Sequence, residues 1–446
     1  MEKMNIFWFR RDLRLEDNHG FYKALTSEEK VLPIFIFDSD ILSQLPNKKD
    51  ARVDFIHQTL MQMNASLPEN KKIHFFFGKP LEIYQHLIQK YNISKVFCNE
   101  DYEPYAIGRD LEIQKFLEAK NIGFETFKDQ VIFHKDEVLK ADGKPYTVYT
   151  PFSRAWKERF KPEFLNAFPS EKHLENIADV PQEKAYKLED LGFEKSGKTF
   201  SKPSTKVPDG YANLRDFPYD DATTKLSVHL RFGTISVRKV LRETEVFGKF
   251  WSEVIWREFF MSILYHFPRV QNSAFKEIYG NFEWKNKEED FKKWCEGKTG
   301  FPIVDAAMRQ LNTIGWMHNR LRMVTAMFLT KDLFIDWRWG ERYFMEHLID
   351  GDLAANNGGW QWSASTGNDA APYFRIFNPA LQSQKFDANG DFIRRYVPEI
   401  AHLDSKTIHE PHGKQRQLFL DYPLPMVNHK QACAFAVEQF EKIKAT

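Results

Sequence analysis

The residues best suited to chemistry lie in the segment 350–362, which reads DGDLAANNGGWQW. It places two carboxylates, an asparagine pair and two indoles around two adjacent glycines. Surface loops rarely carry so many large aromatic side chains, and an apolar core rarely carries so many acids and amides. Amides and carboxylates suit the polar edge of a flat heteroaromatic ligand, while indoles suit stacking or electron transfer. The segment therefore predicts a buried site for such a ligand.

Two sets of three residues recur at the spacing i, i+3 and i+4: Glu253, Trp256 and Arg257, and then Asn319, Arg322 and Met323. This spacing puts each set on one face of a helix. A face made of an acid, an indole and a guanidinium is not a hydrophobic stripe, so it should line a cavity or a groove. Either set alone equally fits a surface face with one buried Trp or Met. Together with the segment 350–362, they favour one shared site.

The first third of the chain is predicted to alternate between strands and helices. The first third of the chain carries short apolar runs at 6–9, 31–37, 73–77, 95–98 and, more weakly, 124–127, with helical patterns between them. This alternation predicts a parallel, five-stranded, Rossmann-like sheet with right-handed crossovers, an α/β domain over residues 1–128. No G-x-G-x-x-G follows the first run, so an ordinary dinucleotide site is not expected.

The rest of the chain changes character twice. Residues 129–200 carry scattered Pro, Gly and Lys and are predicted to be an interdomain linker. Long helical patterns dominate 201–446, which predicts an all-α domain.

The segment 192–199, GFEKSGKT, matches the phosphate-loop pattern. Its flanks are polar on one side and helix-breaking on the other, so a solvated loop is expected instead.

The composition limits the class of protein to which this chain can belong. The 446 residues are 42% hydrophobic and 28% charged, typical of a globular protein with two or more domains. No apolar run approaches the roughly 20 residues that span a bilayer, and the start lacks a signal-peptide pattern. The three cysteines are far apart, which argues against a disulfide framework, an iron–sulfur cluster or a structural zinc site. We expect a cytoplasmic monomer without a metal. Because the net charge is +1, nucleic-acid binding would need a local basic surface.

Five motifs together resemble the photolyase/cryptochrome family: WFRRDLRLEDN at 8–18, WREF at 256–259, GWMHNRLRM at 315–323, the segment 350–362, and YFRIFNP at 373–379. The resemblance covers nearly the whole chain and is closest to class I photolyases that act on cyclobutane pyrimidine dimers. It implies repair of these dimers in UV-damaged DNA by electron transfer from light-excited, reduced FAD.

The resemblance also implies roles for residues toward FAD, which the helical domain would hold non-covalently. The phosphates would be held by Tyr211, Thr223, Thr224, Lys225, Leu226 and Ser227. The flavin would be held by Arg322, Asp350, Gly351, Asp352 and Asn356, with Asn356 facing the flavin N5. Three tryptophans would form an electron-transfer chain from flavin to surface: Trp360, Trp337 and Trp284. Without the resemblance, each of these indoles fits a plain core anchor.

A photolyase must extrude its lesion from the duplex, which costs a few kcal/mol. By resemblance, the residues around the extruded dimer would be Arg215, Glu253, Trp256, Arg257, Asn319, Arg320, Met323 and Trp362, with Arg375 as a further phosphate contact. Trp256 and Trp362 would stack on the pyrimidines. Glu253 would hydrogen-bond the 5′ pyrimidine and stabilise its radical anion.

Three other functions compete. A blue-light receptor of the cryptochrome type shares the scaffold, but plant-type receptors carry Asp where this sequence has Asn356, and only 46 residues follow Ile400. Repair of (6-4) photoproducts is associated with a His pair, whereas this sequence reads His318-Asn319. A dark flavin oxidoreductase would need a nicotinamide site, for which no fingerprint appears.

A second, antenna chromophore is also implied. Folate-binding relatives carry Asn-Glu where this sequence has Tyr105-Ala106, which disfavours a folate. Phe35, Arg52 and Asp101 resemble positions that hold a deazaflavin or flavin antenna in other members, although structural roles fit them equally well.

Overall fold

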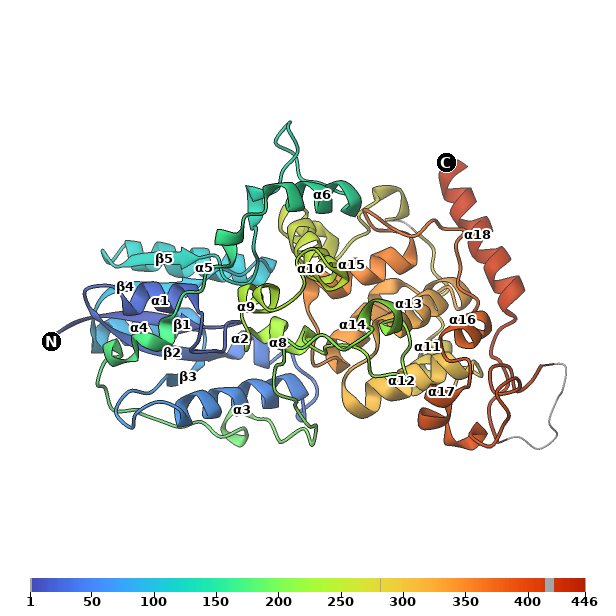
Figure 1. Ribbon diagram of the computed structural model, residues 1–446, viewed down its shortest axis with the longest axis horizontal. Coiled ribbons are helices and arrows are strands. Elements are labelled where there is room, and N and C mark those ends of the chain that lie inside the picture. Colours follow the sequence, from blue (N-terminus) through green and yellow to red (C-terminus); the bar gives the residue numbers. More distant parts are fainter. Residues whose placement is uncertain (1, 281, 414–420, 446) are drawn as a thin grey trace. The chain divides into compact units, whose positions relative to one another are not determined.

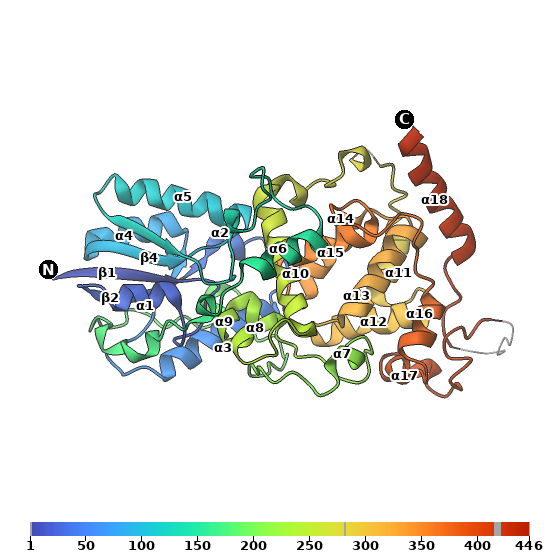
Figure 2. The same cartoon turned by 45° about the horizontal axis from the view of Figure 1, so that its top comes forward.

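The computed structural model describes residues 2–280, 282–413 and 421–445, which form two compact units (Figures 1 and 2). The first unit holds the chain up to Tyr146, Thr150–Lys206 and Thr224–His266. The second holds Thr147–Tyr149, Val207–Thr223 and the chain from Phe267 onward.

The first unit is built on a parallel sheet in the order β3-β2-β1-β4-β5. Its strands are β1 (Lys3–Phe9), β2 (Lys30–Asp38), β3 (His74–Gly78), β4 (Asn92–Asn99) and β5 (Gly123–Phe127). The helices among them are α1 (His19–Leu25), α2 (Ser39–Leu42), α3 (Ala51–Ala65), α4 (Pro80–Lys90) and α5 (Pro104–Glu118). The five predicted strands and the α/β class are confirmed.

The central strand shows why this sequence gives two covered faces. Side chains alternate along a strand, so Phe7 and Trp8 point to opposite sides of β1. Phe7 packs on Phe21 of α1, with ring centroids 5.0 Å apart. Trp8 packs edge-on against Tyr84 of α4, at 5.5 Å. A strand buried on both faces reads as a continuous apolar run, which is the pattern that made β1 predictable.

Residues 129–200, predicted to be irregular, contain a helix. This helix, α6 (Tyr149–Arg159), buries Phe152, Ala155 and Trp156 on one side. Their spacing is helical, but Pro151 and the basic residues around it obscured the pattern. The loop predicted at 192–199 is confirmed, since no helix or strand begins between Gly192 and Lys206.

Three further helices belong to the first unit: α8 (Ser227–Phe232), α9 (Val237–Arg242) and α10 (Lys249–His266). A buried ion network ties α9 to the sheet. Arg238 of α9 lies 2.9 Å from both Asp17 and Asp129, and Arg14 meets both carboxylate oxygens of Asp129 at 2.7 Å. Burial alone would raise the pKa of Asp129, but Arg14 and Arg238 hold it well below its usual range.

The described residues of the second unit form helices joined by loops, with no strand among them. Its helices are α7 (Tyr211–Leu214), α11 (Glu288–Glu296), α12 (Pro302–Ile314), α13 (Asn319–Met327), α14 (Trp337–His347), α15 (Leu353–Ala364), α16 (Pro379–Phe386), α17 (Asp391–Tyr396) and α18 (His429–Ala445). One hydrophobic cluster joins α11, α12, α13, α14, α15 and α17, with Met308, Leu321, Phe344 and Trp360 among its buried members. A second cluster holds α18 through Ala436 and Phe440.

A π-helical turn, η8 (Phe328–Asp332), separates α13 from α14. The Leu333 N–H donates to the carbonyl of Phe328 five residues earlier, at 3.0 Å. The turn buries Lys331, whose Nζ donates to Ser365 Oγ at 2.9 Å and to the Ala364 carbonyl at 3.2 Å. The Lys331 Nζ therefore lies at the C-terminal end of α15, and burial lowers the pKa of Lys331 well below its usual value.

The predicted division at 1–128, 129–200 and 201–446 differs from the two compact units, because α8, α9 and α10 are grouped with the sheet. Compactness alone does not define a domain, so that division stays a prediction. None of the helices in the described part of the chain has the length and apolarity that crossing a membrane requires.

Candidate functional site

The segment 350–362 forms the start and body of α15. Asp352 is the N-cap of this helix, and its carboxylate accepts from the Ala355 N–H at 3.2 Å. A capping carboxylate satisfies an amide that has no partner within the helix. The helix then carries Asn356, Trp360 and Trp362 on its first three turns.

Arg322 of α13 pairs with Asp350, just before α15. One guanidinium nitrogen lies 3.1 and 2.8 Å from the two carboxylate oxygens. The Arg322 Nε donates to the Met317 carbonyl at 2.8 Å, which fixes the guanidinium plane. The Asp350 side chain is 2% exposed and that of Arg322 is 26% exposed. The negative charge of the buried Asp350 is thus compensated by Arg322, while the partly exposed Arg322 guanidinium keeps one side open to a ligand.

Asn356 is held by a residue that the sequence reasoning missed, Glu341 of α14. Its Nδ2 donates to the Glu341 backbone oxygen at 2.9 Å and to Glu341 Oε1 at 3.2 Å. An amide nitrogen has two hydrogens, so Glu341 takes both and Asn356 offers its Oδ1 elsewhere. Burial raises the pKa of Glu341 to about 7, although the Asn356 hydrogen bond lowers it.

Of the three predicted tryptophans, Trp360 and Trp337 belong to the large hydrophobic cluster of the second unit, and Trp284 packs against it. Trp360 and Trp337 are buried, whereas Trp284 is half-buried. This gradient of exposure suits a path from the interior to the surface. The Trp360 Nε1 is buried and has no hydrogen-bond partner among the described residues, so its indole is placed by packing.

Two residues beside Trp360 were also missed. Trp294 of α11 lies with its ring centroid 6.0 Å from that of Trp360, and its Nε1 donates to the Thr325 carbonyl. Gly340 of α14 faces Trp360 so closely that a Cβ there would come within 2.1 Å of the indole. Neither residue belongs to a motif in the sequence, since both contacts join separate helices.

The predicted phosphate-binding residues divide between the two units. In the second unit, Tyr211 begins α7, and the buried Oγ1 of Thr223 has no hydrogen-bond partner among the described residues. In the first unit, Lys225 has a positive φ of 52°, Leu226 is buried and Ser227 begins α8. The Thr224 Oγ1 accepts from the Leu226 N–H at 3.4 Å.

The first predicted triplet lies on one helix, α10, as expected, and this helix is grouped with the sheet in the first unit. Glu253, Trp256 and Arg257 are half-buried. Trp256 packs against Phe260, with ring centroids 5.4 Å apart. Arg257 donates to the backbone carbonyls of Gln130 at 2.6 Å and Leu230 at 3.2 Å. Arg257 thus supports the surrounding loops, whatever else it binds.

The second triplet begins α13, where Asn319 is exposed and Arg322 and Met323 are half-buried. Arg320 pairs with Asp216 at 3.0 Å and lies over the Phe386 ring at 4.4 Å. Among the other predicted substrate residues, Trp362 is half-buried, Arg215 lies 5.7 Å from the Tyr211 ring centroid, and Arg375 is exposed.

His318 caps α13 and is buried. Its Nδ1 accepts from the Arg320 N–H at 3.1 Å. Burial lowers the pKa of His318 to about 4, so the imidazole is neutral at neutral pH. Its Nε2 has no hydrogen-bond partner among the described residues. The orphaned donors in the described part of the second unit therefore include Thr223 Oγ1, His318 Nε2 and Trp360 Nε1.

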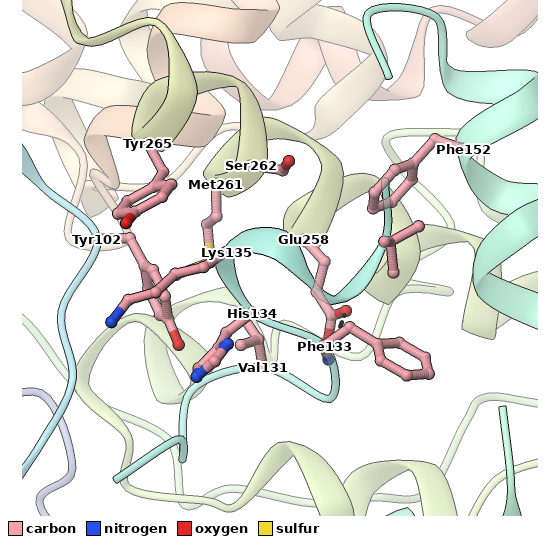
Figure 3. A pocket seen from close by; sticks show the side chains of 11 residues that line it. Tyr102, Val131, Phe133, His134, Lys135, Phe152, Glu258, Met261, Ser262 and Tyr265 are labelled. Carbon is pink, nitrogen blue, oxygen red and sulfur yellow. Dashed lines mark hydrogen bonds between the residues drawn. The ribbon is translucent and has the colours of Figure 1, made fainter. Parts of the chain in front are cut away.

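A separate pocket in the first unit is lined by Tyr102, Phe133, Met261 and Tyr265 (Figure 3). Its volume of about 10 Å³ admits roughly one water molecule, which rules out a cofactor. Glu258 accepts there from the N–H groups of Ile132 and Phe133 and from Trp156 Nε1. Burial raises the pKa of Glu258 to about 7. This carboxyl anchors the loop after β5.

The residues considered for an antenna lie in the first unit. Phe35 is buried in β2, Arg52 pairs with Asp50, and Asp101 pairs with Arg11 at 3.3 Å. An open groove of about 480 Å³ runs past Tyr105 and Arg109, at the N-terminal ends of α4 and α5.

Comparison with known proteins shows the family of this chain. The family model described as DNA photolyase matches residues 5–172, and the FAD binding domain of DNA photolyase matches residues 250–442. A deoxyribodipyrimidine photo-lyase of Vibrio cholerae is 40% identical over 96% of this chain and 97% of its own. The chain belongs to the DNA photolyase family. The photo-lyase of Escherichia coli is 38% identical over 98% of both chains.

Solved structures of photolyases share the fold over the full length. A class III photolyase from Agrobacterium tumefaciens superposes with a TM-score of 0.88, at 33% identity, covering 100% of this chain and 98% of its own. An archaeal photolyase from Sulfolobus tokodaii that contains two FAD molecules gives 0.85, at 32% identity, covering 99% and 100%. A Synechocystis cryptochrome gives 0.82, at 25% identity, covering 98% and 99%.

Proposed function

We propose that this protein is a deoxyribodipyrimidine photo-lyase, which repairs cyclobutane pyrimidine dimers in UV-damaged DNA with light. The observation that carries the proposal is the near full-length similarity to several enzymes of that name, at 37–40% identity. Asn356 supports it further, because plant-type receptors on the same scaffold carry Asp there.

The residues of the second unit fit a flavin on chemical grounds. The Arg322–Asp350 pair offers a guanidinium with an open side beside a compensated buried carboxylate. The orphaned Thr223 Oγ1 is a donor suited to a phosphate oxygen. We therefore propose that FAD is held by the predicted residues: Tyr211, Thr223, Thr224, Lys225, Leu226, Ser227, Arg322, Asp350, Gly351, Asp352 and Asn356. When bound, reduced and excited by light, FAD supplies the electron that splits the dimer and takes it back.

The chain's own residues set the environment for that chemistry. Glu341 fixes the Asn356 amide by taking both of its hydrogens, so Oδ1 is presented as an acceptor toward the flavin N5. Arg322 supplies positive charge that favours an anionic ligand in a buried place. Trp360, Trp337 and Trp284 would carry an electron inward from the surface. Their shared cluster and graded exposure support this role.

Lesion recognition is proposed for the two predicted triplets and their neighbours. Trp256 and Trp362 would stack on the extruded pyrimidines, and Glu253 would hydrogen-bond the 5′ base. Asn319, Met323, Arg215, Arg320 and Arg257 would complete the surrounding wall. Because Arg257 already donates to two backbone carbonyls, its contribution is to shape the wall more than to bind phosphate.

We also propose that a second chromophore, of flavin or deazaflavin type, binds the first unit. The S. tokodaii relative with two FAD molecules supports this, as does the absence of the Asn-Glu pair at Tyr105-Ala106. From the sequence we propose further that the protein acts as a cytoplasmic monomer.

One experiment tests the main proposal. Reduced protein is illuminated with an oligonucleotide that carries a single thymine cyclobutane dimer, and restored thymines are quantified by chromatography. Repair should require both light and the reduced flavin, and a matched (6-4) lesion should remain unrepaired. Photoreduction of a bound flavin without any repair would identify a light receptor instead. Repair of the (6-4) lesion alone would reassign the substrate.

A further inference from the structure

Three metal-ligating side chains meet away from the residues assigned to photochemistry. Asp332 ends the π-turn η8, while His429 and Cys433 lie one helical turn apart on α18. Residues at i and i+4 share one helix face, so both side chains point toward Asp332. The carboxylate, imidazole and thiol ligand atoms all lie within 4.8 Å of one another.

The distances within this cluster match a tetrahedral cation site in part. Zinc bonds of about 2.3 Å to sulfur and about 2.05 Å to nitrogen or oxygen put sulfur about 3.6 Å from nitrogen. The Cys433 Sγ lies 3.6 Å from His429 Nδ1 and 3.5 Å from Nε2, so the ring must turn to point one nitrogen at a shared metal. By the same geometry, oxygen and nitrogen ligands lie about 3.3 Å apart. Asp332 Oδ1 lies 2.5 Å from His429 Nδ1 and is hydrogen-bonded to it. For both atoms to bind one cation, the distance between them would have to grow by under 1 Å.

Asp332 shows that the cluster has unused ligand capacity. Its side chain is fully buried, yet its Oδ2 has no hydrogen-bond partner among the described residues. A buried carboxylate with one orphaned oxygen carries a desolvation penalty that a single imidazole offsets only in part. A divalent cation would compensate this charge.

We propose that Asp332, His429 and Cys433 bind one zinc ion. A thiolate, an imidazole and a carboxylate form a mixed ligand set that suits zinc, whereas magnesium and calcium prefer oxygen ligands throughout. His429 and Cys433 are half-buried, so a water molecule can complete the fourth position from the solvent side. The cysteine spacing in the sequence argued against zinc because only one of these ligands is a cysteine.

A metal here would fasten α18 to the core of the second unit. The helix already packs through Phe440, which lies under the Lys331 ammonium at 3.7 Å, and through Phe435, which meets Phe334 at 5.1 Å. These contacts are apolar or cation–π, and the directional bond at the start of the helix is the hydrogen bond between His429 and Asp332. Zinc would replace this bond with metal bonds to both residues and add a bond to Cys433, one turn further along the helix.

Zinc would take the place of the hydrogen bond between His429 and Asp332. Binding should release protons, because thiolate and neutral imidazole are the forms that bind zinc.

The test uses the untagged full-length holoprotein. After dialysis against a chelator and then against buffer, zinc chloride is titrated by calorimetry, and bound zinc is measured by mass spectrometry. One zinc per chain is expected. X-ray absorption at the zinc edge should show one sulfur at about 2.3 Å with nitrogen and oxygen neighbours at about 2.0–2.1 Å.

Variants then assign the ligands. Cys433→Ser and His429→Gln should each weaken zinc binding by more than about tenfold, since losing even a group that only orients a ligand costs about 10–100-fold. Cys295→Ser and His347→Gln, which change a half-buried cysteine and a half-buried histidine elsewhere in the second unit, should bind like wild type. Circular dichroism and flavin content confirm that each variant folds.

Three results would overturn the proposal. One is the absence of stoichiometric zinc in the wild type. Another is an absorption spectrum without a sulfur neighbour, which needs no variant to interpret. The third is unchanged zinc affinity in folded Cys433→Ser, which would leave the cluster as an ion pair that only packs α18.

Discussion

The Asn356 amide nitrogen lies 2.9 Å from the backbone oxygen of Glu341 and 3.2 Å from its Oε1. The two residues lie on neighbouring helices, α15 and α14, so this contact fixes the amide relative to a second element. A carboxyl that titrates near neutral pH therefore holds the residue proposed to face the flavin N5.

We predict that Glu341→Gln flattens the dependence of stability on pH. Burial raises the pKa of Glu341 from 4.5 to about 7, so between these values the folded state holds a proton that the unfolded state has lost. Stability therefore falls as pH rises through this window. Glutamine keeps an Oε1 acceptor for Asn356 but cannot ionise. Urea unfolding of both proteins at pH 5 and pH 8 measures the difference, and equal pH slopes would contradict the assignment.

Trp360→Phe should block light-driven reduction of the bound flavin while sparing repair when the flavin is supplied already reduced. Phenylalanine keeps most of the packing but is far harder to oxidise than an indole. Absorption changes under blue light with an external reductant measure photoreduction. Trp339→Phe, in the same hydrophobic cluster, is the control and should photoreduce normally. Loss of both activities in Trp360→Phe would make that indole chiefly structural.

Gly340→Ala should destabilise the second unit and disturb Trp360. The added Cβ would lie 2.1 Å from the indole and 2.6 Å from Leu329, so one of them must move. Overpacking of this kind costs about 1–3 kcal/mol. Gly359→Ala, on the helix that carries Trp360, meets nothing within 4 Å and should be neutral or slightly stabilising. Thermal unfolding distinguishes the two variants, and equal melting temperatures would refute the close contact.

Glu253→Ala should lower the repair yield per absorbed photon more than it weakens lesion binding. Its proposed role is to stabilise charge on the 5′ pyrimidine after electron transfer, and binding precedes that step. Quantum yield and gel-shift affinity are compared with those of Glu245→Ala, an exposed acid just before α10. Equal losses of yield and affinity would show that Glu253 acts only in binding.

Asp129→Asn should destabilise the first unit by about 3–5 kcal/mol, because it removes the carboxylate that pairs with buried Arg14 and leaves buried Arg238 with Asp17 alone. The lowered pKa of Asp129 means that its contribution is present above the ordinary carboxyl range and is lost only in strong acid. Asp142→Asn, an exposed partner of Lys144, should change stability by less than about 0.5 kcal/mol. Denaturant unfolding measures both, and similar small effects would exclude the buried network as a stabilising element.

The sheet was predictable chiefly because its strands β1 and β2 are buried on both faces and so read as apolar runs. Trp8 and Phe7 show this, as they pack on helices from opposite sides. The strand β5, which is half-buried or exposed along its length, gave the weakest signal. The motifs on α10, α13 and α15 were predictable because their residues recur at helical spacing. The contacts between separate helices could not be predicted from the sequence. Glu341, Trp294 and Gly340 act through contacts between helices, and neither composition nor periodicity encodes which helices meet.

The π-turn at Phe328–Asp332 makes the length of this segment matter more than its composition. Two consecutive residues, Lys331 and Asp332, reach different elements from it, one at the end of α15 and one at the start of α18. Each residue of a helix advances its side chain by about 100° around the axis. Loss of a single residue within this turn would therefore misdirect Lys331 or Asp332 from its partner, so an exchange of residue type elsewhere in the turn should be tolerated more readily than a deletion.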